Sequence, residues 1–156
     1  MKKEMFLKSN LLDEKSIALD VNARTVEMVL HILTELLGPT HVRPGFEKAL
    51  IEREHEYPTG LPTQPVGVAL PHADPKLVVQ AGLIIVVLRN PVMFEEMGNP
   101  DQKVEVRVVI GIALPEDFIE NQTPMLSWLL EKIQQVTWLN EVLAVSSPRD
   151  MLRLFR

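Results

Sequence analysis

The sequence of 156 residues contains no cysteine. Disulfide bonds and thiolate zinc sites are therefore excluded, and so is a cysteine nucleophile within this chain. Long apolar runs are also missing, because the longest, residues 82–88, is far too short to span a bilayer. Residues 5–12 include Lys8, Ser9 and Asn10 where a signal peptide would be apolar, so we expect a cytoplasmic protein.

Several common catalytic and binding motifs are absent as well. The chain has no glycine-rich phosphate-binding loop and no Gly-x-Ser-x-Gly elbow, which argues against those nucleotide-binding and hydrolase classes. Its four histidines, His31, His41, His55 and His72, do not pair at metal-ligand spacing, so neither a metal nor another cofactor is predicted. The net charge of −5 argues against nucleic acid as the main partner.

The residues that are present predict one domain over residues 1–156, because 46% hydrophobic and 24% charged residues are ordinary for a globular chain of this length. Apolar residues at helical spacing predict helices at 23–37, 44–56, 124–136, 139–145 and 148–155. Extended apolar patterns predict strands near Ile17 and Leu19 and at 66–70, 82–88 and 104–113. Proline and glycine breakers predict a loop at 89–100. This order predicts an α/β fold with helices on both faces of a sheet.

A histidine at the end of a short strand is the centre of the stretch 57–74. The apolar residues 66–70 are followed directly by Pro71 and His72. Proline has no N–H to continue a sheet ladder and restricts Leu70 to extended geometry, so His72 is predicted at the lip of the sheet. Ligands and chemistry collect at that lip in open α/β sheets. From the pattern alone, His72 is either a polar turn residue or a nucleophile.

Two charged residues flank this histidine in the sequence. Arg53 follows Phe46 by two helical turns, so periodicity points it inward, where an unpaired charge needs a partner or an anion. Asp74 precedes Pro75, and it either caps a helix that begins there or holds the His72 ring through an N–H bond. A backbone carbonyl could hold the ring instead.

Residues 50–72 resemble the type-2 enzyme IIA domains of the bacterial phosphoenolpyruvate-dependent sugar phosphotransferase system. The matching features are Arg53-Glu54 at a helix end, Pro58-Thr59, and a strand that ends at Pro71-His72. The spacing from Arg53 to His72 is similar to that of the galactitol branch, and residues 106–113 resemble the family's central strand. The resemblance implies an α/β fold with a mixed, largely parallel sheet that includes an antiparallel strand and lies between helices.

The resemblance also implies a role for each matching residue. His72 would accept a phosphoryl group through Nε2 from the phosphohistidine of the carrier protein HPr, and would pass it to a cysteine of an enzyme IIB. Arg53 would neutralise the phosphoryl oxygens, and Thr59 would donate a hydroxyl to them. Gln122 is the nearest match to a second histidine that many members carry. The acceptor cysteine must belong to another polypeptide, and contact with the membrane would be indirect, through the transporter.

Two other functions remain open from the sequence. One is a regulatory protein that resembles the nitrogen-related enzyme IIA proteins and acts by binding partners. The other is an interaction module that is never phosphorylated. If His72 is a phosphoryl acceptor, two partners must reach it, so we expect an apolar rim there. Met93, Phe94 and Met97 are the candidates for that rim, with core filling as the alternative.

Overall fold

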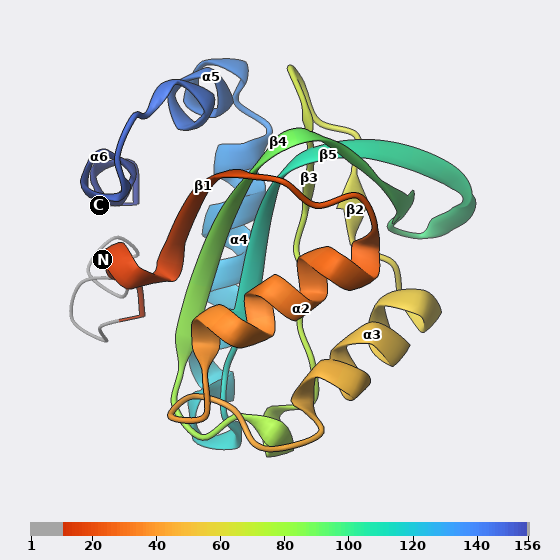
Figure 1. The fold of residues 1–156 in the computed structure, drawn as a ribbon, viewed down its shortest axis with the longest axis vertical. Coiled ribbons are helices and arrows are strands. Elements are labelled where there is room, and N and C mark those ends of the chain that lie inside the picture. The colour runs from red at the N-terminus through yellow and green to blue at the C-terminus, as the bar shows by residue number, and fades with distance from the viewer. Residues whose placement is uncertain (1–10, 156) are drawn as a thin grey trace.

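The computed structural model describes residues 11–155, apart from the side chains of residues 119–123. A mixed sheet lies between two layers of helices (Figure 1). Helices α2 (Val26–Leu37) and α3 (Phe46–Glu56) cover one face, and α4 (Gln122–Ile133) covers the other. The predicted α/β fold, with a mixed sheet between helices, is confirmed.

Five strands form the sheet within the described residues: β1 (Ile17–Val21), β2 (Gly60–Leu61), β3 (Gly67–Ala69), β4 (Gly82–Glu96) and β5 (Asn99–Ala113). The longest pairing, between β4 and β5, is antiparallel. The pairings of β1 with β4 and of β3 with β5 are parallel, and β2 is antiparallel to β3. Since β2 also meets the far end of β4, these pairings close into a circuit that fixes the β2–β3 hairpin against the central strands.

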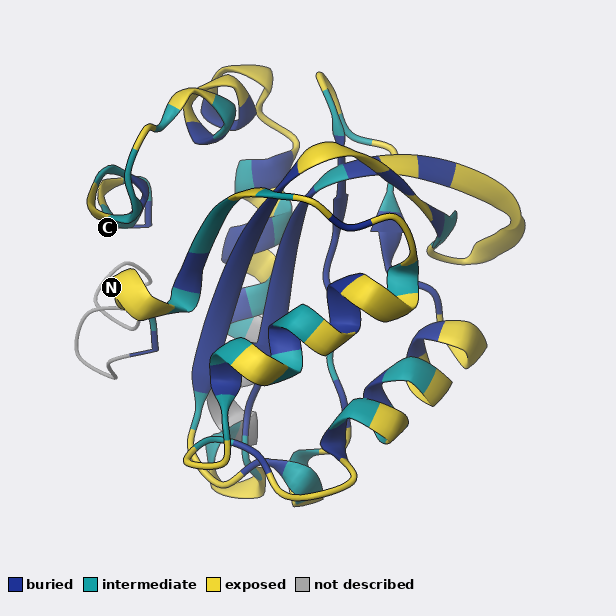
Figure 2. Cartoon of the chain, in the orientation of Figure 1, coloured by how far each residue is buried: buried dark blue, intermediate teal, exposed yellow. Residues whose placement is uncertain are grey.

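The apolar core is divided by the sheet into two halves. Side chains alternate along a strand, so successive residues of β4 enter opposite halves. Leu83, Ile85 and Val87 pack with α4, whereas Ile84, Val86 and Leu88 pack with α2 and α3. Figure 2 shows this part of β4 and β5 buried throughout. Burial on both faces explains why residues 82–88 form a continuous apolar run.

The predicted loop at 89–100 is wrong. Strand β4 continues to Glu96 and β5 begins at Asn99, so the segment forms the tip of a long hairpin. Gly98 adopts a φ of 76° in the turn, a conformation that suits glycine. Pro91 and Pro100 are both exposed at this end of the hairpin, where prolines are tolerated.

The three residues predicted to form an apolar rim around His72 do not lie there; Ala73, Pro75, Ile112 and Leu114 line that place instead. Phe94 pairs with Val104, whereas His72 forms a bridge with Ile112, near the other end of β5. Phe94 is 0% exposed and belongs to the core, so the alternative interpretation of core filling holds for it. Met93 and Met97 are exposed, but they lie on the same distant hairpin.

The C-terminal helices α5 (Val136–Ala144) and α6 (Pro148–Arg153) return to the half of the core that contains α4. Their contact includes an aromatic cluster, in which the Trp138 and Phe155 ring centroids are 5.4 Å apart and Trp128 packs against both. Among residues 11–155, no helix is both long enough and apolar enough to cross a membrane.

We predict that Phe94→Ala lowers the free energy of unfolding by about 3–5 kcal/mol, because it empties a fully buried site. The neighbouring Met93 is the matched control, since it is 51% exposed on the other side of the same strand. Met93→Ala should change the free energy of unfolding by no more than about 0.5 kcal/mol. Urea denaturation of both variants measures the difference, and equal losses would contradict the placement of Phe94 in the core.

Candidate functional site

His72 lies where the pairing between β3 and β5 ends. Ile112 N–H donates to the Pro71 carbonyl at 2.9 Å, and His72 forms an isolated parallel bridge with Ile112. The prediction that His72 sits at the end of a strand is therefore confirmed. Its half-buried side chain lines a hollow of about 220 Å³, together with Arg53, Ala73, Pro75, Ile112 and Leu114.

The backbone fixes the tautomer of the His72 ring. Nδ1 lies 3.0 Å from the Leu70 carbonyl oxygen, and because a carbonyl can only accept, Nδ1 carries the proton. The lone pair is then on Nε2, for which the described residues offer no hydrogen-bond partner. Among these residues no buried side-chain nitrogen or oxygen lacks a partner, so Nε2 is open to solvent.

Asp74 does not hold the ring. Its carboxylate accepts from Lys76 N–H at 2.9 Å and caps the short 3-10 helix Pro75–Leu77. Of the alternatives left open by the sequence, the structure supports the cap for Asp74 and the backbone carbonyl for His72.

Burial lowers the pKa of His72 below its usual value, and the positive charge of Arg53 adds a smaller shift in the same direction. The hydrogen bond to Leu70 acts the other way but does not reverse the result. The ring is therefore predominantly neutral at pH 7, with an available lone pair on Nε2.

Arg53 is exposed, so the prediction that it points into the core is wrong. The buried residues of α3 follow a four-residue step, Phe46, Leu50 and then Glu54, which leaves Arg53 beside the stripe. Arg53 nevertheless lines the His72 hollow, and its guanidinium carbon lies 5.4 Å from the centre of the Tyr57 ring. Within the described part of the chain, no carboxylate is close enough to form an ion pair with it.

Thr59 is buried and bonded to Glu54. The Thr59 N–H and hydroxyl donate to the two Glu54 carboxylate oxygens at 2.7 and 2.8 Å. The hydroxyl proton that the resemblance assigns to a phosphoryl group is thus already donated to Glu54. Sequence reasoning gave Glu54 no role, although the four-residue step from Phe46 through Leu50 was the signal that could have found it.

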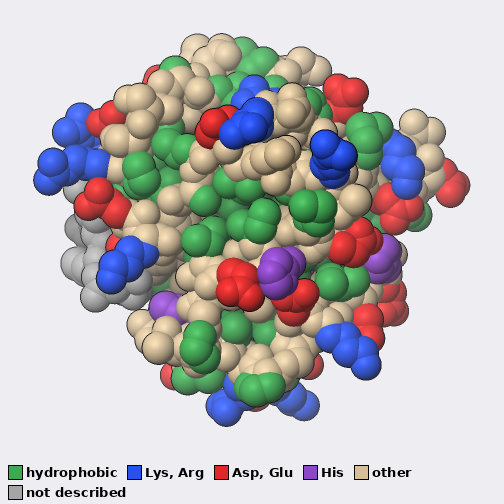
Figure 3. All heavy atoms as spheres, viewed as in Figure 1, with side chains coloured by type: hydrophobic (Ala, Val, Ile, Leu, Met, Phe, Trp, Pro, Cys, Tyr) green, Lys and Arg blue, Asp and Glu red, His purple; other side chains and the backbone are tan. Residues whose placement is uncertain are grey.

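The remaining candidate residues either lie away from the His72 hollow or have side chains outside the described part of the structure. Gln122 begins α4, but its side chain is not among the described ones. His31 and His55 bind Glu47 and Glu27, at 2.8 and 3.4 Å, and Figure 3 shows histidines beside acidic side chains on the face formed by α2 and α3. The described residues contain no group of three side chains suited to holding a metal.

These features combine into a site for an anionic electrophile. A neutral imidazole presents a lone pair at Nε2, and a guanidinium without an ion-pair partner among the described residues lines the same hollow. Imidazole nitrogen is a nucleophile in covalent catalysis, and guanidinium is a strong binder of phosphoryl oxygens. The arrangement can accept a phosphoryl group and share its negative charge.

Comparison with known proteins identifies related sequences. Residues 10–156 match the family described as "Phosphoenolpyruvate-dependent sugar phosphotransferase system, EIIA 2". The chain is also 30% identical over 109 residues to the galactitol-specific EIIA component of the phosphotransferase system of Escherichia coli strain K12. That match covers 70% of this chain and 71% of the relative.

Solved structures share the fold. The nitrogen regulatory protein IIA-Ntr from Neisseria meningitidis superposes with a TM-score of 0.76 at 24% identity, over 96% of this chain and 99% of that one. Enzyme IIA mannitol of Escherichia coli, solved in complex with phosphorylated enzyme IIB mannitol, gives a TM-score of 0.73 at 23% identity. That match covers 92% of this chain and 96% of the other. At these identities the likeness concerns the fold alone.

We predict that His72 titrates below the usual histidine value of 6.5, whereas His31 titrates above it because its ring binds Glu47. Folding lowers the His72 pKa, so its contribution to the free energy of unfolding is present above pH 6.5 and is lost as the pH falls below it. Long-range ¹H–¹⁵N NMR across a pH titration measures both midpoints and the tautomer. A His72 midpoint above that of His31, or a proton on Nε2 in the neutral ring, would contradict the site geometry.

Proposed function

This chain belongs to the EIIA 2 family of the phosphoenolpyruvate-dependent sugar phosphotransferase system and is a phosphotransferase component; from that premise, we propose that His72 is its phosphoryl acceptor. The observation that carries the proposal is the His72 ring, whose Nδ1 is held by Leu70 while Nε2 stays open at a hollow lined by Arg53. The described residues include no second histidine beside this hollow.

The proposed step is a transfer between nitrogen atoms. The Nε2 lone pair of His72 attacks the phosphorus of phosphohistidine on the donor, and a new N–P bond forms. The donor N–P bond breaks, and its electron pair returns to the donor imidazole. The proton on Nδ1 stays in place, shared with the Leu70 carbonyl, which stabilises the positive charge that develops on the ring.

Arg53 supplies charge for this step in the proposal. A phosphoryl group that arrives at Nε2 brings negative oxygens into the hollow that Arg53 lines. The guanidinium can move from the Tyr57 ring to those oxygens without breaking an ion pair with any described residue. Stabilisation of the phosphoryl charge by a cation is a major source of catalysis in phosphoryl transfer.

The proposed donor is phosphorylated HPr, and the proposed acceptor is a cysteine thiolate of an enzyme IIB. In the second step the thiolate attacks phosphorus, and His72 leaves as a neutral imidazole that keeps its Nδ1 proton. The solved complex of Escherichia coli enzyme IIA mannitol with phosphorylated enzyme IIB supports a partner of this kind. Because this chain has no cysteine, the acceptor sulfur belongs to the partner. We therefore propose that the chain acts in the cytoplasm.

We assign the substrate of the transporter to the galactitol-like polyols. The support is the 30% identity over 109 residues to the galactitol-specific component of Escherichia coli. A regulatory role like that named for the Neisseria protein is the alternative. Both roles involve phosphorylation of His72, so detecting phosphohistidine does not separate them. Transfer of the phosphoryl group to the galactitol enzyme IIB would support the transport role.

We predict that phosphoenolpyruvate, enzyme I and HPr label the protein at His72 and that His72→Ala abolishes the label. His31→Ala is the matched control, since His31 lies on the outer face of α2. This variant should still be labelled at His72 as in the wild type. Phosphate mapping by mass spectrometry and lability in acid identify a phosphohistidine. Absence of label on the folded wild type would favour an interaction module that is never phosphorylated.

We predict that Arg53→Gln slows phosphorylation of His72 by about 10²-fold, because it removes the cation from the hollow while leaving the nucleophile intact. Arg149→Gln removes an exposed arginine from α6 and should leave the rate unchanged. Single-turnover rates with phosphorylated HPr measure the effect. Equal rates for the two variants would show that Arg53 does not share the phosphoryl charge.

A further inference from the structure

Glu54 is a buried carboxylate that the transfer steps do not use. It is 6% exposed, and its two oxygens accept from the Thr59 N–H and the Thr59 hydroxyl. Burial of a carboxylate is costly unless its oxygens are bonded, so this pair of hydrogen bonds has to offset a penalty. Burial of this carboxylate directly after Arg53 in the sequence points to a specific structural role.

The contacts of Glu54 join the two halves of the site. On one side, Glu54 is in the last turn of α3 directly after Arg53. On the other side, Thr59 leads into β2, where Gly60 pairs with Ala69, and β3 then runs to His72. The position of Gly60 is itself fixed, because a Cβ there would lie only 2.6 Å from the Glu95 carbonyl oxygen. Glu54 therefore ties the helix end that carries Arg53 to the hairpin that leads to His72.

We propose that Glu54 is a positioning residue for phosphoryl transfer, which sets the placement of Arg53 relative to His72 by holding Thr59. The proposal rests on the proposed function, because it concerns the rate at which His72 is phosphorylated. Glu54 does not touch the transferred group. Its side chain lines a different hollow, of about 530 Å³, on the other side of the last turn of α3.

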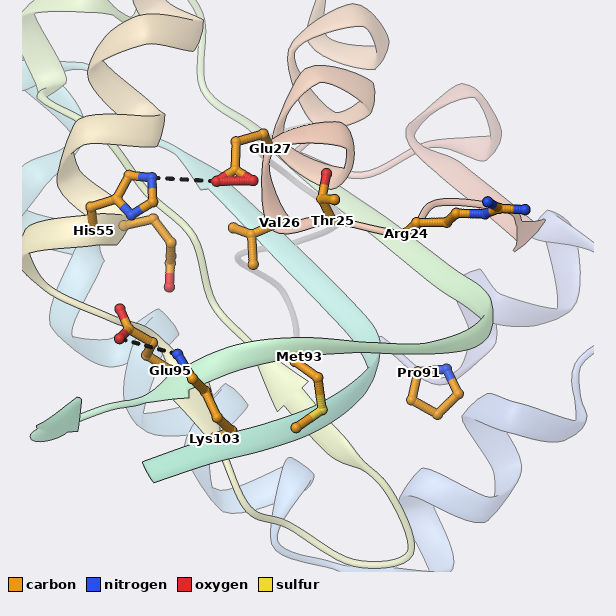
Figure 4. Close-up of a pocket in the computed structure, with 10 residues that line it drawn as sticks. Arg24, Thr25, Val26, Glu27, His55, Pro91, Met93, Glu95 and Lys103 are labelled. Carbon is orange, nitrogen blue, oxygen red and sulfur yellow. Dashed lines mark hydrogen bonds and ion pairs between the residues drawn. The ribbon is translucent and has the colours of Figure 1, made fainter. Parts of the chain in front are cut away.

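The surroundings of Glu54 make this tie sensitive to protonation. Burial raises the pKa of Glu54 to about 7, against the lowering effect of its bonds to Thr59. Nearby His55 lowers the pKa and Glu95 raises it. Figure 4 shows His55 bound to Glu27 and Lys103 bound to Glu95 in the same hollow. The full set of charged or titratable residues that line it with Glu54 is Arg24, Glu27, His55, Glu95 and Lys103.

Protonation reverses one of the two hydrogen bonds. The ionised carboxylate accepts from the Thr59 hydroxyl, whereas a protonated carboxyl donates to the Thr59 oxygen. The first arrangement is charge-assisted and therefore the stronger tie. Because Glu54 ionises as the pH rises through about 7, the phosphorylation rate should rise over that interval.

Two variants separate the geometry from the charge. Glu54→Gln can keep both bonds, with its amide oxygen accepting from the Thr59 N–H and its amide nitrogen donating to the Thr59 hydroxyl, but it does not ionise. Glu54→Ala leaves both Thr59 donors without their partner. Glu52→Gln is the matched control, because Glu52 is an exposed glutamate in the same helix.

The test is the rate of His72 phosphorylation by phosphorylated HPr, measured across a pH range centred on about 7. We expect the wild type and Glu52→Gln to share a step near pH 7 that is missing in Glu54→Gln. We expect Glu54→Ala to lower kcat by about 10- to 100-fold with little change in KM for phosphorylated HPr, since misplaced catalytic groups slow the chemical step. Wild-type rates and pH profiles for both Glu54 variants would overturn the proposal.

A measurement on the wild type decides the matter if Glu54→Ala does not fold. NMR can follow the Glu54 carboxyl carbon and the Arg53 Nε–H through the same pH titration. A shared midpoint is expected, and an Arg53 signal that ignores the ionisation of Glu54 would overturn the proposal. A folded wild type that is never labelled would instead contradict the proposed function itself, so the two failures are distinguishable.

Discussion

The parallel pairing of β3 with β5 is the constraint on which the site depends. Pro71 still offers a carbonyl to Ile112 but has no N–H to donate, so the ladder is interrupted just before His72, whose pairing with Ile112 is an isolated bridge. Within the described residues, the Leu70 carbonyl accepts from the His72 ring and not from another strand. The break that ends the strand therefore also supplies the acceptor that fixes the tautomer. A single local feature, proline before histidine, accounts for both the position of the ring and its available nitrogen.

The choice of that acceptor sets the charge of the nucleophile. A carboxylate on Nδ1 would favour the protonated ring, whereas a carbonyl orients the ring without adding a negative charge. Burial and Arg53 then both favour the neutral His72 ring, the form that the proposed transfer needs. In that proposal, the same positive charge of Arg53 stabilises the phosphoryl group once it is attached. One guanidinium thus favours the reactive form of the nucleophile and the phosphorylated product.

The sequence predicted the structure correctly where the outcome depends on the covalent geometry of one residue, such as proline, or on a continuous apolar run. Pro71 ended a strand, and residues 82–88 formed one covered on both faces, as predicted. Predictions from the sequence were wrong where the position of a residue depends on a partner in another structural element. Arg53 and Glu54 both fit an amphipathic helix end; the four-residue step from Phe46 and Leu50 favours Glu54, and the two donors of Thr59 satisfy its carboxylate once it is buried. Pro91 and Gly98 usually interrupt a strand, but an exposed hairpin tolerates both residues. Only the pairing of β4 with β5 shows that the strand continues through this segment.

The last turn of α3 separates the Arg53 guanidinium from the Glu54 carboxylate, although the two residues are neighbours in sequence. Successive residues of a helix point about 100° apart, so Arg53 lines the hollow of His72 while Glu54 lines the hollow on the other side. A direct ion pair between them would occupy the guanidinium and weaken its attraction for a phosphoryl group. Thr59 adds to this separation, because its N–H and hydroxyl donate to both Glu54 oxygens. The guanidinium stays available for an anion because the helix points the neighbouring carboxylate into a different hollow, where Thr59 binds it.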